Sequence, residues 1–175
     1  MAMPATIVTV EKLVFGGQAL GRLPDGKVIF VWNALPGETV EVEHIKKKNG
    51  VMEGVATTII TASPNRVEPK DPHFLSSAPW EMISDEGEAE WKKNMAAEVY
   101  SKIGDMILSA GDLELVGNEH MYGYRNKMEF SFAHVDPSHD ADKAVYHPTS
   151  LALFERGGRT CFPIESAATA EDCIN

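Results

Sequence analysis

The stretch GGQALGRLPDGKVIFVWNALPGETVEV, from Gly16 to Val42, predicts the fold of the first part of the chain. It holds a β-branched and aromatic run, Val28 to Val31, which follows Pro24-Asp25-Gly26. That tripeptide is a turn signal because proline fixes φ and glycine accepts a positive φ. After Leu35-Pro36-Gly37-Glu38, strict alternation resumes from Thr39 to Glu43. Short strands separated by turns at this spacing are typical of a small barrel.

Two further strands are expected outside this stretch, at Thr6 to Val14 and at Gly54 to Ala62. Between them, His44 to Gly50 is expected to run into a turn at Asn49-Gly50, which would place its three lysines on a loop tip. The sequence therefore predicts a first domain over residues 4–66, a β-barrel of about five strands.

The pattern changes after the barrel. Residues 67–86 are predicted to form an irregular connector, whose Phe74 and Trp80 are expected to pack against other parts of the protein. Apolar residues then recur every three or four positions, which predicts an amphipathic helix from Glu88 to Leu108. Further strands are expected at Leu113 to Val116, Tyr124 to His134 and Leu151 to Phe154. These elements predict an α+β central domain over residues 87–175.

The charge is unevenly distributed along the chain. The formal net charge of −10 argues against a nucleic-acid partner, because phosphate neutralisation needs Lys and Arg. Residues 1–66, however, carry seven basic and six acidic side chains, so the excess of acid lies in the rest of the chain. The two cysteines, Cys161 and Cys173, lack the spacing of a disulfide framework or zinc ribbon, and no apolar run is long enough to cross a bilayer. We expect a soluble, cytoplasmic, monomeric protein.

Basic and aromatic residues of the predicted barrel are candidates for binding RNA. Arg22, Lys27 and Lys46 to Lys48 could follow a single-stranded backbone, with Phe30 or Trp32 as a platform on which a base stacks. The alternative is a solvated lysine loop with ordinary core aromatics, and charge alone favours that alternative.

A second candidate cluster, Tyr124-Arg125-Asn126-Lys127, begins the longest predicted strand of the central domain. Arg and Lys can hold phosphate while Asn contacts a base edge or ribose. The alternative is the start of a strand whose charges lie in water, since the buried face begins only at Met128.

One loop is rich in metal-ligand residue types, but we expect no metal there, because a flexible Pro-Ser-His-Asp loop does not fix ligands. These residues are His134, Asp136, His139, Asp140, Asp142 and His147. We also find no nucleophile with its base, no Walker loop and no dinucleotide-binding fingerprint, so the sequence predicts no catalytic residue.

The Gly16 to Val42 run resembles a TRAM domain, a small barrel related to oligonucleotide-binding folds that is appended to RNA-modifying enzymes. The segments that follow, RVEPKDPHF from Arg66, a helix with Trp91-Lys92-Lys93, YRNKMEFSF from Tyr124 and LALFERGGRTCFPIE from Leu151, resemble in this order the N-terminal half of the RNA uracil C5-methyltransferases. This resemblance covers nearly the whole chain.

The resemblance implies S-adenosylmethionine as methyl donor, held with the catalytic cysteine and base in a C-terminal Rossmann-like domain that this sequence, ending at Asn175, does not reach. Many members of the family also hold an iron–sulfur cluster on four cysteines. The matching positions here are Asp71, Ser77, Trp80 and a residue near Ala167, none of which supplies a thiolate. We therefore expect a branch without the cluster, and no cofactor in this chain.

The sequence thus predicts the RNA-binding N-terminal portion of a uracil C5-methyltransferase for ribosomal or transfer RNA, inactive alone, with no DNA or membrane partner. A stand-alone RNA-binding or chaperone protein, and an acidic protein-interaction domain, remain open alternatives. The residues expected to contact RNA are Arg22, Lys27, Phe30, Lys46, Lys47, Lys48, Arg125, Asn126 and Lys127.

Overall fold

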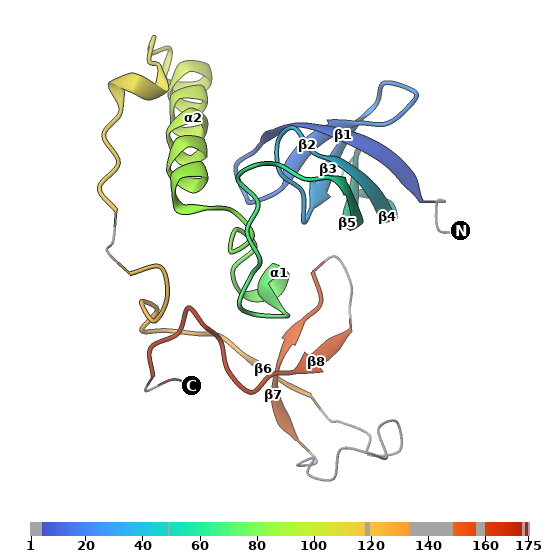
Figure 1. Ribbon diagram of the computed structural model, residues 1–175, viewed down its shortest axis with the longest axis vertical. Coiled ribbons are helices and arrows are strands. Elements are labelled where there is room, and N and C mark those ends of the chain that lie inside the picture. Colours follow the sequence, from blue (N-terminus) through green and yellow to red (C-terminus); the bar gives the residue numbers. More distant parts are fainter. Residues whose placement is uncertain are drawn as a thin grey trace. The chain divides into compact units, whose positions relative to one another are not determined.

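The computed structural model describes residues 5–48, 50–117, 120–133, 149–156, 160–172 and 174, without the side chains of His44 and Lys48. The chain forms two compact units, shown in Figure 1. The first combines Met1–Pro69 with Pro79–Gly117, and the second combines Lys70–Ala78 with Asn118–Asn175. The domain limits at residues 66 and 86 stay predictions.

A closed barrel of five strands fills most of the first unit, which confirms the predicted β-barrel. The strands close in the order β1-β2-β3-β5-β4, and only the β3–β5 pair is parallel. Their bounds are β1 Thr6–Leu13, β2 Ala19–Arg22, β3 Val28–Trp32, β4 Thr39–Lys48 and β5 Val51–Thr61.

Alternation along the strands fills the barrel interior. In β3, Ile29 and Val31 are fully buried while Val28, Phe30 and Trp32 lie on the outer side. In β4, Val40 and Val42 are fully buried, as the alternation from Thr39 predicts. Phe30 is therefore available at the barrel surface because its neighbours in sequence form the core.

The lysine run does not lie on a loop tip, so that expectation is wrong. Strand β4 continues to Lys48, and Lys46 and Lys47 pair with Glu53 and Met52 of β5. The reason is the length of the β4–β5 hairpin, which satisfies the backbone N–H and C=O groups of these residues in the ladder. Lys46 and Lys47 consequently project from opposite faces of one strand.

The helix predicted from Glu88 is confirmed, with shifted ends. Helix α2 spans Asp85–Gly104. Its N-cap residue is Ser84, whose side chain accepts a hydrogen bond from the Gly87 amide at 3.3 Å. It ends where Asp105 adopts a left-handed conformation with φ of 50°. A short 3-10 helix, η1, follows at Ala110–Asp112, and the strand expected at Leu113 to Val116 is wrong, since those residues form no ladder.

The second unit holds a short helix, α1 Phe74–Ser77, and an antiparallel sheet in the order β6-β7-β8, which agrees with the α+β prediction. The strands are β6 Ser131–Ala133, β7 Ser150–Phe154 and β8 Cys161–Pro163. Within the described residues, the strand expected from Tyr124 exists only as β6. The preceding stretch instead forms an isolated bridge between Arg125 and Ala170.

Candidate nucleic-acid interface

Three of the predicted RNA-binding residues meet at one open hollow of about 780 Å³ on the barrel. Lys27 comes from the β2–β3 turn, Phe30 from the outer face of β3, and Lys47 from the end of β4. The parallel pairing of β3 with β5 places Met52 beside this group, because Ile29 is paired with Met52. The complete lining is Leu23, Asp25, Lys27, Val28, Phe30, Lys47, Gly50, Val51 and Met52.

Asp25 holds Lys27 at the rim of the hollow. Its carboxylate accepts a hydrogen bond from the Lys27 amide at 3.1 Å and forms an ion pair with Lys27 Nζ at 2.6 Å. The hydrogen bonds from Lys27 lower the pKa of the Asp25 carboxyl below its usual value. The side chain of Lys27 stays 72% exposed, so its ammonium group can exchange Asp25 for another anion.

The other predicted barrel residues do not line the hollow. Arg22 is exposed and donates from Nε to Glu11 Oε1 at 2.8 Å, on strand β1. Lys46 is exposed on the opposite face of β4 from Lys47. The side chain of Lys48 lies outside the described residues.

Of the two aromatic platforms considered, only Phe30 faces the hollow. Trp32 packs at Gly17, where a Cβ atom would lie 3.5 Å from the Trp32 ring and 3.5 Å from Trp80 Nε1. Trp80 Nε1 donates to the Gly17 carbonyl at 3.2 Å. The two tryptophans thus flank the β1–β2 turn and stabilise it, and the expected packing of Trp80 is explained by this contact.

The second candidate cluster has one residue tied into the fold, Arg125, and three exposed residues, Tyr124, Asn126 and Lys127. Arg125 is half-buried and donates from Nη1 to the Ser77 carbonyl at 3.0 Å, so it holds the end of α1. Asn126 is exposed, and exposed Lys127 forms an ion pair with Glu129 at 2.9 Å. Of the three residues of this unit that are predicted to bind RNA, Arg125, Asn126 and Lys127, the last two therefore present polar groups that a ligand reaches directly.

Two cationic contacts of the second unit were not foreseen from the sequence. Lys70 Nζ lies 3.6 Å from the centre of the Tyr122 ring. Arg156 donates from Nε to the Leu75 carbonyl at 2.8 Å, and burial lowers the pKa of its guanidinium. Both pairs join residues more than fifty positions apart, so no local pattern could have indicated them.

The positions that match the cluster cysteines do not fit an iron–sulfur cluster. The Asp71 carboxylate accepts hydrogen bonds from the Ala168 amide at 3.2 Å and 2.9 Å, and Ser77 is turned toward the His73 carbonyl at 3.5 Å. Among the described residues no group of three His, Cys, Asp or Glu side chains is placed to hold a metal ion. The His- and Asp-rich stretch from His134 to His147 lies outside the described residues.

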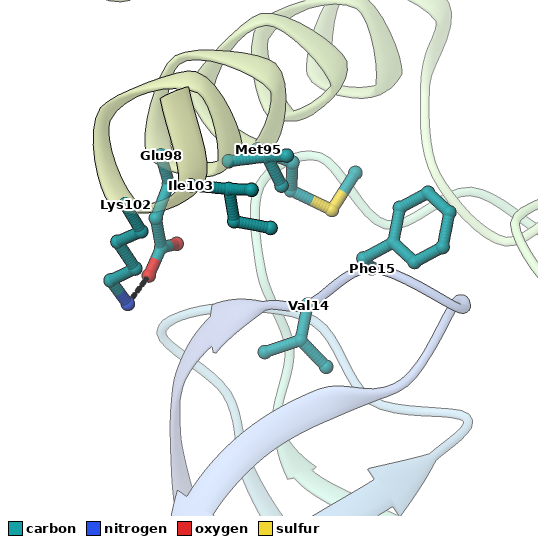
Figure 2. Close-up of a pocket in the computed structure, with 7 residues that line it drawn as sticks. Val14, Phe15, Met95, Glu98, Lys102 and Ile103 are labelled. Atoms are coloured by element: carbon teal, nitrogen blue, oxygen red, sulfur yellow. Dashed lines mark hydrogen bonds and ion pairs between the residues drawn. The ribbon is translucent and has the colours of Figure 1, made fainter. Parts of the chain in front are cut away.

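A groove of about 220 Å³ lies elsewhere in the first unit, between α2 and the end of β1. Figure 2 shows Met95 and Ile103 of α2 facing Val14 and Phe15, with Lys102 bonded to Glu98 at one side. Lys12 of β1 also binds Glu98, at 2.5 Å. No helix of the described chain has the length and apolarity that crossing a bilayer requires.

Comparison with known proteins shows what this arrangement resembles. The TRAM domain model matches residues 7–57, which run from β1 into β5. An uncharacterized RNA methyltransferase of Nitratidesulfovibrio vulgaris is 29% identical over 170 residues, 95% of this chain and 34% of the relative. One from Treponema denticola is 35% identical over 102 residues, 57% of this chain and 25% of the relative.

A relative with a more specific name is the 23S rRNA (uracil(1939)-C(5))-methyltransferase RlmD of Erwinia tasmaniensis, 54% identical over 67 residues, 38% of this chain and 15% of the relative. The chain thus spans at most 34% of the length of these curated relatives. The match to the TRAM model and these similarities agree with the resemblance found in the sequence. Residues 7–57 thus form a TRAM domain, and the chain is similar to part of several proteins named as RNA methyltransferases.

Proposed function

We propose that this chain binds single-stranded segments of ribosomal or transfer RNA and orients them for uracil C5-methylation. The observation that carries the proposal is the hollow on the TRAM barrel, where Lys27 and Lys47 lie beside the Phe30 ring. Cations that follow the phosphates, combined with an aromatic face, are the usual means of binding unpaired RNA. The uracil C5 target rests on the similarity to the Erwinia rRNA uracil C5-methyltransferase.

The net charge of −10 does not oppose this proposal, because the acidic residues are concentrated outside the barrel. Exposed Asn126 and Lys127 of the second unit supply a second set of contacts in the proposal. Methyl transfer itself, with S-adenosylmethionine as donor, is assigned to none of the described residues.

The test is the affinity of the purified chain for fluorescently labelled single-stranded RNA, measured by anisotropy over a series of salt concentrations. We expect the binding constant to fall with salt, and the double variant Lys27→Gln/Lys47→Gln to reduce the slope by about 0.7 for each lysine. The control Lys92→Gln/Lys93→Gln removes the same charge from α2 and should keep the slope. Absence of binding at low salt, or a slope insensitive to both variants, would contradict the proposal.

A further inference from the structure

The hollow on the barrel combines two kinds of surface in one small space. Its floor is apolar, made of Val28 and the Phe30 ring of β3 together with Val51 and Met52 of β5. Its rim carries two cations, Lys27 and Lys47. An apolar floor with a ring suits a flat aromatic ligand, and cations at the rim suit an anionic group attached to it.

The size and the openness of the hollow limit what can enter. A space of about 780 Å³ is within the range of small-ligand sites, and it is much too small for the width of an RNA duplex. In a duplex, moreover, both faces of each base are covered by neighbouring bases. Only an unpaired base can place its face on Phe30.

The rim is already partly neutralised by a group of the protein itself. The Asp25 carboxylate binds the Lys27 amide at 3.1 Å and Lys27 Nζ at 2.6 Å. The second contact takes the position in which a phosphate oxygen would bind the ammonium group. A phosphate entering the hollow must therefore displace the Asp25 carboxylate from Lys27 Nζ, or share it. Among the residues that the structure describes, Lys47 has no ion-pair partner, so it offers its charge without that competition.

We infer that this hollow is a subsite for one unpaired RNA nucleotide, whose base stacks on Phe30, whose phosphate lies between Lys27 and Lys47, and whose entry Asp25 opposes. This inference rests on the proposed function and adds to it a defined position and an internal competitor. The contact at Phe30 makes binding depend on an unpaired base, whereas charge alone would accept any phosphate chain.

The experiment measures the affinity of the full chain for short labelled oligouridine and for the same RNA annealed to its complement. Phe30→Leu keeps an apolar side chain but removes the ring, and Phe30→Trp keeps a ring. We expect Phe30→Leu to weaken oligouridine binding roughly 5- to 100-fold and Phe30→Trp to retain it. Asp25→Asn should bind tighter, by up to about fivefold. Duplex binding should be unchanged by the Phe30 variants.

Three outcomes separate the two proposals. If the wild-type chain binds no RNA at low salt, both are overturned. If it binds RNA but Phe30→Leu and Phe30→Trp bind alike, or Asp25→Asn binds more weakly, the subsite is overturned and the RNA-binding function stands. A measurement on the wild-type chain avoids the risk that a variant misfolds. On addition of oligouridine, the methyl NMR signals of Val28 and Met52 should shift more than that of Ala152 in the second unit. Equal or absent shifts would overturn the subsite.

Discussion

Glu38 and Arg66 form an enclosed bidentate ion pair that joins the barrel corner to the segment after β5. Glu38 is 0% exposed, and its two carboxylate oxygens accept from Arg66 Nε at 2.6 Å and Nη2 at 2.9 Å. The same carboxylate accepts from the amides of Leu35 at 2.8 Å and Ser63 at 3.0 Å. Arg66 Nη2 also donates to the Asn33 carbonyl at 3.1 Å. Every charge of this pair is therefore met by a partner, as burial requires.

Removal of Arg66 should destabilise the chain strongly, because it leaves the Glu38 carboxylate buried and uncompensated. We expect Arg66→Met to lower the free energy of unfolding by about 3–5 kcal/mol, measured by urea denaturation. Arg66→Lys should lie between Arg66→Met and the wild type, since an ammonium group lacks the planar fork of N–H donors that matches both carboxylate oxygens. The control is Lys92 of α2, which forms an exposed ion pair with Glu88 at 2.6 Å. Lys92→Gln should change stability by about 0.5 kcal/mol or less. A loss below about 1 kcal/mol for Arg66→Met would contradict the structural role given to the pair.

This pair also shows where reasoning from the sequence reaches its limit. The sequence indicates a break in the strand pattern at Leu35-Pro36-Gly37-Glu38, and the strands on both sides follow from local residue patterns. The burial of Glu38 could not be predicted, because its partner Arg66 is 28 residues further along the chain. Local patterns indicate which face of an element is apolar, but they do not indicate which distant side chain meets it.

The same limit explains the outcome at the candidate site. The sequence named Lys27, Phe30 and Lys47 as separate residues, and the closed barrel brings them to one hollow. The error at the lysine run has a similar cause, since the end of β4 is set by pairing with β5 and not by the residues themselves. Leu113 to Val116 fails as a strand because it finds no pairing partner among the described residues.

Gly21 should resist substitution, because β1 and β2 approach each other closely at this residue. A Cβ atom at Gly21 would lie 2.5 Å from Val8 Cγ1 and 2.9 Å from the Thr9 carbonyl oxygen, so backbone must move. We expect Gly21→Ala to cost about 1–3 kcal/mol of unfolding free energy, as overpacking does. At Gly117 no atom of the described residues lies within 4 Å of the added Cβ, and Gly117→Ala should stay within about 0.5 kcal/mol of the wild type. Equal stability of the two variants would show that the barrel tolerates the extra atom.

Glu98 should make the stability of the first unit depend on pH. Hydrogen bonds from Lys102 and Lys12 hold the pKa of its carboxyl below the usual value. Figure 2 shows the bond between Lys102 and Glu98. A depressed folded-state pKa contributes stability above the unfolded-state pKa, and that contribution is lost as pH falls through the folded-state pKa. At neutral pH, Glu98→Gln should therefore have a free energy of unfolding about 0.2–1 kcal/mol lower than the wild type, measured by urea denaturation. The difference between the two proteins should shrink at acidic pH. A difference that is constant from neutral to acidic pH would contradict this assignment.

Asp71 should anchor the C-terminal segment of the second unit through the Ala168 amide. Its carboxylate is 8% exposed and accepts both hydrogen bonds from that amide, at 3.2 Å and 2.9 Å, at a position where cluster-containing relatives are expected to place a cysteine. Asp71→Ala leaves the amide without its acceptor, which costs about 1–3 kcal/mol, so hydrogen exchange at Ala168 should accelerate about 5- to 100-fold. Asp71→Asn retains one acceptor oxygen and should exchange at an intermediate rate. Asp112→Ala, which breaks an exposed contact of η1, is the matched control and should leave Ala168 unchanged. Unaltered protection of the Ala168 amide in Asp71→Ala would contradict the anchoring role given to this carboxylate.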